Sequence, residues 1–563
     1  MRPWFRSVAA ILAMSLWTGM LPAGSQPVRA HKGLVVSQNA IASNTGADVL
    51  RNGGNAMDAA IATALALAVT HPTAGNIGGG GFIVYRPATG EPVAYDFRET
   101  APAKASAMMF LKNGKYDSAI HHNGYLSVGV PGTPAGLYLA WKECGKLPWK
   151  SLVAPAIKLA RNGFVVTEDL SRSLKHVLPE MKEYPASFAQ FSKQGKPYQA
   201  GDILRQPDLA RTLEKIAALG PTGFYQGENA LLIERDMAAH GGLITREDLK
   251  NYRARRRTPL RGTYRGYEII AIPPASSGGT VLLEMLNILE GYDLAANGFG
   301  SAANVHLIAE AMRRAYEDRA QYLGDPDFNP QMPIDRLISK QYAGELRRTI
   351  KKDAASKSSP TSFEWSQESS ETTHLSAVDA QRNAVSLTYT LEDGYGSMII
   401  APGTGFLLNN QMGDFNAGPG WTDAEGLIGT EPNLTAPGKR MLSSMTPTIV
   451  ARDGQLFMVT GSPGGRTIIN TVLETILNVI DFGMNVQEAV DAPRFHHQWL
   501  PDKIVHERNG LSPDSIAILK SMGHQLQATS SQGITEAIVF NRKDNLLEGA
   551  WDRRAADGGA ASQ

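Results

Sequence analysis

The chain has 563 residues, of which 43% are hydrophobic, and a formal net charge of +1. This length and composition allow a large core in one or two domains. The nearly balanced charge gives no indication of nucleic acid or an anionic membrane as a partner. A lone Cys144 excludes an internal disulfide and any site that needs several thiolates.

The 12 histidines show no HExxH or other metal-ligand spacing, so we expect neither a metal site nor a cofactor. His121–His122 and His496–His497 are adjacent pairs, and on a strand the two side chains of such a pair would point to opposite faces. Ordinary structural or surface roles are the simpler interpretation of these histidines.

The N-terminus has the features of a targeting segment. Arg2 and Arg6 precede a mostly apolar run over 9–21, and small residues follow at 23–25. An apolar run this short favours a secretory signal peptide over about residues 1–23, with an uncleaved anchor as the alternative. No later stretch reaches the ~20 continuous apolar residues of a spanning helix, so we expect no stable membrane insertion and a periplasmic or secreted protein.

Helical and glycine-rich patterns follow in the first part of the chain. Residues 56–69 are rich in Ala and Leu and predict a buried helix. Four consecutive glycines at 78–81 permit close backbone approach or positive φ, but they lack the GxGxxG or GK[ST] context of a nucleotide site. Residues 303–322 and 467–480 predict two further helices.

Residues 351–370 are polar and Ser-rich, which is typical of a loop or a disordered linker. Two alternating segments follow at 372–378 and 384–390, with a turn-like segment of five residues between them, and together they predict a β-hairpin. If Val378 pairs with Ala384, Thr372 lies opposite Thr390, and the two hydroxyls share a face.

A threonine directly after a polar linker can become a nucleophile if the chain is cut before it. A free α-amine has a pKa near 7.7–8.0 and can take the proton of the hydroxyl on the same residue, whereas a peptide nitrogen cannot. The Thr372 hydroxyl could make that cut itself by attacking the Glu371 carbonyl, which gives an ester that water hydrolyses. Serine- and threonine-rich strand starts are common, so this pattern alone leaves an ordinary strand as the alternative.

Seven segments resemble those of γ-glutamyltranspeptidases, which belong to the N-terminal-nucleophile hydrolase superfamily. They are NGGNAMDAAIATALALAVTHPTAGNIGGGGF (52–82), DFRETAPAKA (96–105), TTHLSAVD (372–379), LLNNQMGDF (407–415), MLSSMTPTIV (441–450), GSPGG (461–465) and DAPRFHHQW (491–499). The resemblance implies a four-layer αββα sandwich of the α+β class. It also implies self-processing into a large chain (24–371) and a small chain (372–563) that form a heterodimer.

The resemblance further implies transfer of a γ-glutamyl group from glutathione and related compounds to water, amino acids or dipeptides. Such a donor carries an α-carboxylate and an α-ammonium. Arg98 is the expected carboxylate ligand, because guanidinium matches carboxylate bidentately, and Ser443 and Ser444 add neutral donors. Asp414, Gln411 and Glu392 are the expected ammonium ligands, although many family members have Asn at the position of Glu392.

The backbone N–H groups of Gly464 and Gly465 are the expected donors to the oxyanion of the tetrahedral intermediate. We expect Thr390 to orient Thr372. Residues 416–440 resemble the lid loop of some bacterial members, with Trp421 as the only aromatic residue where several members have Tyr. The Asn433-Leu434-Thr435 sequon within it is interpreted as accidental.

Three alternatives remain open. An acylase for glutaryl-type β-lactam side chains would leave the ammonium ligands without a function. A non-enzymatic periplasmic binding protein would not need the nucleophile and the oxyanion glycines. A Ser-His-Asp hydrolase lacks its usual GxSxG motif in this sequence.

Overall fold

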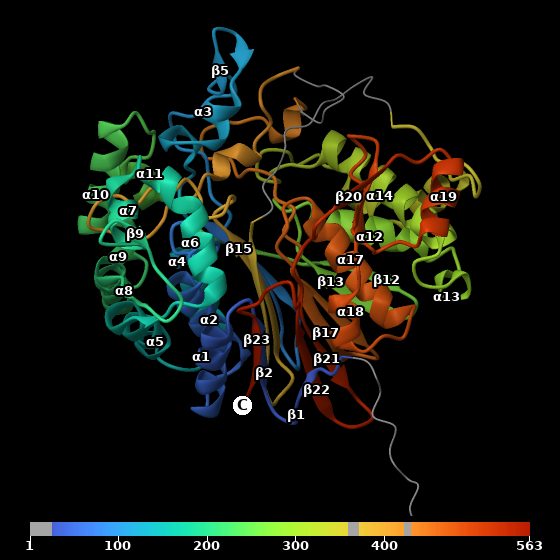
Figure 1. Cartoon of the computed structure of the whole chain (residues 1–563), viewed down its shortest axis with the longest axis horizontal. Helices are drawn as coiled ribbons and strands as arrows, with labels where there is room; N and C mark the ends of the chain where they lie inside the picture. The colour runs from blue at the N-terminus through green and yellow to red at the C-terminus, as the bar shows by residue number, and fades with distance from the viewer. Residues whose placement is uncertain (1–24, 359–370, 421–428) are drawn as a thin grey trace, which may run out of the picture.

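The computed structural model describes residues 25–358, 371–420 and 429–563. Two seven-stranded sheets lie face to face at the centre, and helices cover the outer face of each sheet (Figure 1). This is the four-layer αββα sandwich that the resemblance implies. The expected signal segment 1–23 and residues 359–370 of the polar linker lie outside the described residues.

The first sheet, called sheet I here, contains the predicted hairpin at its centre, and its neighbouring strands are antiparallel. Its strands, in spatial order, are β11 (Arg255–Arg257), β4 (Val93–Asp96), β3 (Gly80–Arg86), β15 (Ala384–Thr390), β14 (Thr373–Val378), β2 (Leu34–Ser37) and β23 (Gly559–Ser562).

The second sheet, sheet II, is also antiparallel throughout. In spatial order its strands are β1 (Val28–Ala30), β22 (Leu546–Trp551), β21 (Glu536–Asn541), β17 (Gln455–Gly461), β16 (Thr448–Arg452), β13 (Tyr267–Ala271) and β12 (Leu260–Tyr264).

The predicted helices are confirmed to within one residue. The segment 56–69 forms α2 (Ala56–Thr70), which starts with a capping box between Asn55 and Asp58 and is buried along its whole length. A helix that is apolar on all sides has to be buried on all sides, and α2 packs between sheet I and other helices. The other two predictions form α14 (Ala302–Tyr322) and α17 (Thr467–Ile480) on sheet II.

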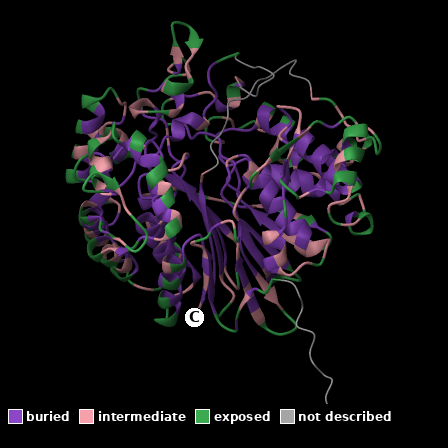
Figure 2. Ribbon diagram, in the orientation of Figure 1, coloured by how far each residue is buried: buried purple, intermediate pink, exposed green. Residues whose placement is uncertain are grey.

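Apolar side chains from both sheets fill the space between them. Phe82 of β3, Ile270 of β13 and Val459 of β17 are at most 1% exposed and belong to one cluster. Figure 2 shows the central strands buried over most of their length, whereas exposed residues concentrate on the outer helices and loops. Every residue of β14 and β15 is buried, because α2 packs against one face of these strands and sheet II packs against the other.

The predicted hairpin register is confirmed. Val378 pairs with Ala384, and the pairing continues to Thr373 opposite Tyr389. The strand begins at Thr373, one residue later than predicted, so Thr372 lies just before the ladder. On the other side of β15, Thr390 pairs with Gly80 of β3.

Sheet I contains strands from both sides of residue 371 in the sequence. β14 and β15, which follow residue 371, lie between β3 and β2, which precede it, and β23 at the C-terminal end of the chain covers β2. A cut before Thr372 would therefore leave two chains that share both sheets and the core between them.

The condition considered for the adjacent histidines, a position on a strand, does not apply to the first pair. His121 and His122 lie in the short helix α3 (Ser118–His122), and their ring centroids are 4.5 Å apart. The two side chains therefore lie side by side.

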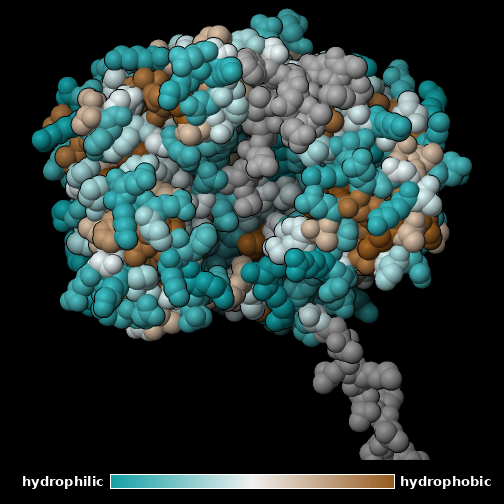
Figure 3. All heavy atoms as spheres, turned by 45° about the horizontal axis from the view of Figure 1, so that its top comes forward, coloured by the Kyte–Doolittle hydropathy of each residue, from teal (hydrophilic) through white to brown (hydrophobic). Residues whose placement is uncertain are grey.

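Among the helices that the structure describes, none combines the length and the apolar character that a membrane crossing needs. The face seen in Figure 3 is mainly hydrophilic, and its hydrophobic side chains form separate small patches.

Candidate active site

A cavity of about 270 Å³ lies at the end of the central hairpin. The predicted site residues line it with the exception of Gly464, and Met445 and Ile468 join them. The cavity therefore brings together residues from segments that are more than 350 positions apart in the sequence, such as Arg98 and Gly465.

Two threonine hydroxyls meet at the bond before Thr372. The Thr372 Oγ1 atom lies 2.6 Å from the carbonyl oxygen of Glu371 and 3.2 Å from Thr390 Oγ1. The Thr390 hydroxyl is 3.0 Å from the same carbonyl oxygen and accepts the Glu392 backbone N–H at 2.9 Å. Because each hydroxyl has one proton, a consistent arrangement is that Thr372 donates to Thr390 and Thr390 donates to the carbonyl.

The glycine run explains how close these segments lie. A Cβ added to Gly79 would lie 2.0 Å from the carbonyl oxygen of Thr390, and one added to Gly81 would lie 2.4 Å from that of Thr388. Such distances are incompatible with any side chain, so these glycines serve close backbone approach. The alternative expectation of positive φ does not apply to the four glycines at 78–81.

Arg98 is fully buried beside the cavity and pairs with Asp414 through its Nη2 atom. The guanidinium also donates to the carbonyl oxygens of Met441 at 3.2 Å and Leu442 at 3.4 Å. The Gln411 amide donates to Asp414 at 2.6 Å. The cationic and anionic groups predicted for a zwitterionic substrate are therefore in direct contact.

A second buried carboxyl lies next to Arg98. Glu99 Oε2 is 3.5 Å from Arg98 Nη1, and both side chains are fully buried. Burial raises the pKa of Glu99 to about 8, although the positive charge of Arg98 acts in the opposite direction. Glu99 is therefore mostly protonated at neutral pH, and Arg98 keeps its net positive charge for other partners.

Ser443 and Ser444 also line the cavity and are held from behind by a second arginine. The Arg319 guanidinium donates to Ser444 Oγ at 3.0 Å and to Ser277 Oγ at 2.8 Å, and Ser277 in turn donates to the Ser443 carbonyl at 2.7 Å. The sequence analysis missed Arg319, which lies on α14 without any motif around it.

Glu392 adopts a left-handed backbone conformation with φ of 83° and is 3% exposed. This conformation is unfavourable for a residue with a side chain and persists only where the surroundings impose it. Glu392 lines the cavity, as predicted. Its carboxylate also contacts His122, which no motif in the sequence assigned to the site.

The glycine pair of the turn after β17 has positive φ at both positions, 130° at Gly464 and 54° at Gly465. Gly465 lines the cavity, and Gly464 lies directly before it against Gly533. The Thr467 hydroxyl donates to the Gly464 carbonyl at 2.7 Å at the start of α17. The turn is thus fixed at its C-terminal side by a helix.

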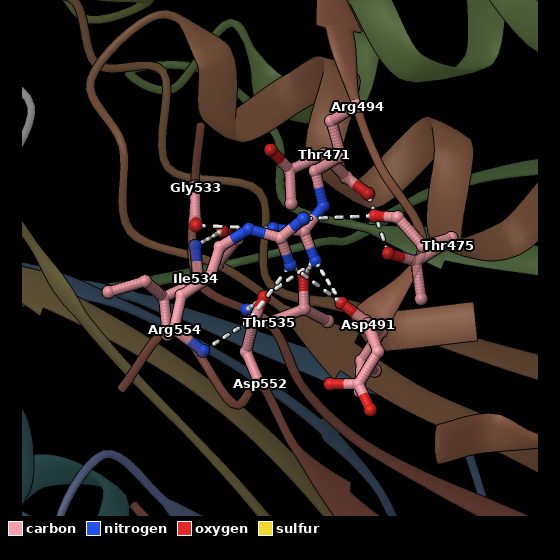
Figure 4. Close-up of polar contacts among 12 residues, drawn as sticks. Thr471, Thr475, Asp491, Arg494, Gly533, Ile534, Thr535, Asp552 and Arg554 are labelled. Carbon is pink, nitrogen blue, oxygen red and sulfur yellow. Dashed lines mark hydrogen bonds and ion pairs between the residues drawn. The ribbon is translucent and has the colours of Figure 1, made fainter. Parts of the chain in front are cut away.

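Behind this turn lies a buried arginine (Figure 4). Arg494 donates to Asp552 at 2.6 Å and to the carbonyl oxygens of Gln532 at 2.8 Å and Gly533 at 3.1 Å. The next residue, Ile534, donates its N–H to Ser462 Oγ in the turn. Arg494 therefore supports the turn through the loop that contains Gly533 and Ile534. Arg494 belongs to the DAPRFHHQW segment, which was the only sign of its importance in the sequence.

His374, two residues after Thr372, lies on the other side of the same turn. A Cβ on Gly461 would be 2.3 Å from the His374 ring, and the ring bonds to the hydroxyls of Thr388 and Ser376. Burial lowers the pKa of His374 to about 3, so this imidazole is neutral at physiological pH.

The expected lid residue Trp421 lies outside the described residues. Asn433, which forms the sequon, is 6% exposed. Its amide donates to the Asp414 carbonyl at 2.7 Å and accepts the Leu442 N–H at 2.8 Å. These contacts join the segments that carry the two sets of charged ligands and agree with the interpretation of the sequon as accidental.

Away from the cavity, His306, Glu310 and His524 have ligand atoms within 4.8 Å of one another, a grouping with no recognisable spacing in the sequence. His306 Nδ1 and His524 Nε2 are already 2.8 Å apart, and Glu310 is paired with Arg313 and Arg314. Two adjacent guanidinium groups oppose a divalent cation, so this arrangement is better suited to a structural polar cluster.

Comparisons with known proteins agree with this geometry. The family model described as gamma-glutamyltranspeptidase matches residues 42–562. The glutathione hydrolase proenzyme of Escherichia coli is 48% identical over 539 residues, which cover 94% of this chain and 92% of that protein.

Solved structures extend the comparison. The structure of Helicobacter pylori gamma-glutamyltranspeptidase is 49% identical with a TM-score of 0.55, and the match covers 56% of this chain and 91% of that one. The cephalosporin acylase from Bacillus halodurans is 29% identical with a TM-score of 0.85, over 98% of this chain and 99% of that one. By the extent of the family match and the identity to its relatives, the chain belongs to the γ-glutamyltranspeptidase family.

Proposed function

We propose that this protein is a γ-glutamyltransferase and glutathione hydrolase that activates itself by cleavage between Glu371 and Thr372. The observation that carries the proposal is the contact of the Thr372 hydroxyl, the Thr390 hydroxyl and the Glu371 carbonyl within 2.6–3.2 Å, in the same cavity as Arg98 and Asp414.

The self-cleavage has two steps. Thr372 Oγ1 attacks the Glu371 carbonyl carbon while the Thr390 hydroxyl donates to the carbonyl oxygen. The C–N bond breaks, an ester forms, and the proton that the Thr372 hydroxyl loses ends on the Thr372 nitrogen, which becomes an amine. Water then hydrolyses the ester, which leaves a carboxylate on Glu371 and restores the hydroxyl of a now N-terminal Thr372.

Catalysis uses the same hydroxyl on the γ-carbonyl of the donor. The α-amine of Thr372 takes the proton of the hydroxyl and passes it to the leaving amine, which for glutathione is the Cys-Gly amine. Backbone N–H groups of Gly464 and Gly465 stabilise the oxyanion, a kind of contact that contributes about 3–4 kcal/mol in other enzymes. Water, an amino acid or a dipeptide then accepts the γ-glutamyl group from the ester.

Recognition of the donor depends on both of its charges. Arg98, Ser443 and Ser444 would bind the α-carboxylate. Asp414, Gln411 and Glu392 would bind the α-ammonium, because charged partners in a water-poor cavity interact more strongly than in bulk water. For location we propose the periplasm or the exterior, on the strength of the apolar run and small residues at the N-terminus.

The test of self-cleavage is a pair of neighbouring substitutions. Thr372→Ala should leave one chain without activity, as seen by intact mass and N-terminal sequencing. Thr373→Val, at a buried position beside it, should still give two chains, the smaller starting at residue 372. Two chains from Thr372→Ala would overturn the proposal.

The acylase alternative is tested with two anilides. A γ-glutamyl-anilide carries the α-ammonium, whereas a glutaryl-anilide lacks it. If Asp414 and Glu392 serve recognition, kcat/KM should favour the γ-glutamyl compound by at least about tenfold, and equal values would favour an acylase.

A further inference from the structure

Glu392 has a histidine partner that does not line the cavity. His122, the last residue of α3, has its Nδ1 atom 3.3 Å from Glu392 Oε1. The His122 side chain is 18% exposed and that of Glu392 is 3% exposed. An imidazole therefore faces a nearly buried carboxylate that also lines the active-site cavity.

Asn410 fixes the two segments relative to each other. Its amide nitrogen donates to the His122 carbonyl at 3.0 Å and to Asp393 Oδ2 at 2.6 Å, and its amide oxygen accepts the Asp393 N–H at 3.1 Å. Because Asp393 follows Glu392 directly, one side chain holds the backbones that carry both members of the pair.

Gly413 of η2 (Gln411–Asp414) allows this close packing. A Cβ at position 413 would lie 2.4 Å from His122 Nδ1 and 2.5 Å from Glu392 Oε1. The element that carries Asp414 and Gln411 therefore lies directly against the imidazole–carboxylate pair.

The neighbouring His121 has a different role. Its Nε2 bonds to the Met412 carbonyl at 3.1 Å and its Nδ1 to the Tyr116 hydroxyl at 3.1 Å. Burial holds the pKa of His121 well below the usual value, and the adjacent His122 adds to this effect. His121 thus joins α3 to η2 as a neutral ring, and His122 is the member of the pair that faces the carboxylate.

The titratable and charged groups around His122 come from four elements. They are His121 of α3 and Asp117 at its start, Tyr116 of β6 (Lys115–Tyr116), Glu392 and Asp393 beyond β15, and Asp414 of η2. Carboxylates predominate among these groups.

We propose that His122 is a specificity-determining residue that controls, through its protonation, how strongly Glu392 binds the α-ammonium of the donor. This inference rests on the proposed function. With neutral His122, the negative charge of Glu392 is available to the ammonium. With protonated His122, the imidazolium neutralises Glu392 and repels the ammonium.

The consequence is a loss of donor affinity in acid. Histidine is the side chain that changes charge between about pH 5 and 8, and the measurement covers about pH 5.5 to 7.5 within this range. For a γ-glutamyl-anilide we expect KM to rise about tenfold over this range, since a charge pair of this kind is commonly worth a factor of ten. For a glutaryl-anilide, which has no ammonium, KM should not rise in acid.

The experiment measures KM and kcat of the fully processed enzyme with both anilides from pH 5.5 to 7.5. In His122→Gln, the ratio of the two KM values should change less than about twofold with pH, because an amide does not titrate in this range. His122→Asn is a second neutral variant in case the first is poorly folded. Glu392→Gln should raise KM for the γ-glutamyl-anilide and shrink its pH dependence.

The matched control is His240→Gln. His240 Nδ1 lies 3.4 Å from Asp236 Oδ1 on the outer helix α10 (Gly227–Ala239), a histidine–carboxylate pair outside the cavity. This variant should keep the wild-type dependence of the KM ratio on pH.

The outcomes separate the two proposals. If wild-type enzyme prefers the γ-glutamyl-anilide but His122→Gln and His122→Asn keep the wild-type pH dependence of the ratio, the role of His122 is overturned while the proposed function stands. If wild-type enzyme shows no preference at pH 7.5, ammonium recognition itself fails, and the inference about His122 fails with it.

Discussion

At the scale of one residue, burial decides which groups compensate the positive charge of Arg98. A buried guanidinium is stable only if other groups compensate it, and here Asp414 and two backbone carbonyls do so. Glu99 could have neutralised Arg98 permanently, but burial raises its pKa to about 8. At neutral pH the positive charge of Arg98 is therefore available to the α-carboxylate of a donor.

This arrangement predicts an alkaline loss of affinity. As pH rises through about 8, Glu99 loses its proton, and its carboxylate competes with the donor for Arg98. KM for a γ-glutamyl-anilide should rise several-fold from pH 7 to 9 in the wild type and clearly less in Glu99→Gln. The donor ammonium also titrates in this range, so the comparison is between the two profiles, and coincident profiles would contradict the role of Glu99.

At the scale of elements, the site depends on how β3, β14 and β15 meet. The hairpin puts Thr390 opposite the residue before β14, and the glycines of β3 and the preceding turn let the backbone come within contact distance of Thr390. The position of the Thr390 hydroxyl is therefore determined by a strand on each side.

Gly79→Ala tests this dependence. The new Cβ would clash with the Thr390 carbonyl, which lies 2.0 Å away, and the end of β15 would have to move. We expect a destabilisation of about 1–3 kcal/mol and at least tenfold slower self-cleavage, followed as loss of the uncut chain on gels.

The matched control is Gly344→Ala in α16 (Lys340–Arg348), where the added Cβ has only Arg347 Nη2 at 3.7 Å nearby. Alanine favours helices, so this variant should be as stable as the wild type or slightly more stable and should be cleaved normally. Normal cleavage of Gly79→Ala would show that Thr390 is positioned by the hairpin alone.

At the scale of the whole molecule, the two sheets are joined beneath the site. His374 of sheet I contacts Gly461 of sheet II, and burial lowers the pKa of this histidine to about 3. The unfolded chain binds a proton on this residue near pH 6.5, whereas the folded protein does not. His374 therefore makes the folded state lose stability as pH falls from about 6.5 towards 3.

Acid unfolding tests this link between the layers. Each such histidine contributes a slope of about 1.4 kcal/mol per pH unit to the free energy of unfolding between its two pKa values. In His374→Gln the melting temperature should fall less steeply between pH 6 and 4 than in the wild type, even if the variant melts lower at pH 7. Parallel curves would show that His374 is not a neutral core residue.

Much of this protein is determined by the sequence itself. The apolar helix predicted over 56–69 and the hairpin register follow from local pattern, because periodicity is a property of short segments. The charged residues that line the cavity were singled out by the motifs that resemble those of the family. The local pattern did not show how completely these elements are enclosed, since both strands of the hairpin are buried over their whole length.

Only the tertiary structure decided which residues act together across the chain. The contacts of His122 with Glu392, of Arg319 with Ser444 and of His374 with Gly461 join segments 87 to 270 positions apart, where no spacing rule applies. The protonation of Glu99 and His374 likewise depends on burial, which is a property of the packed sandwich. A sequence specifies the groups of an active site, but distance and dielectric surroundings exist only after the layers have closed around them.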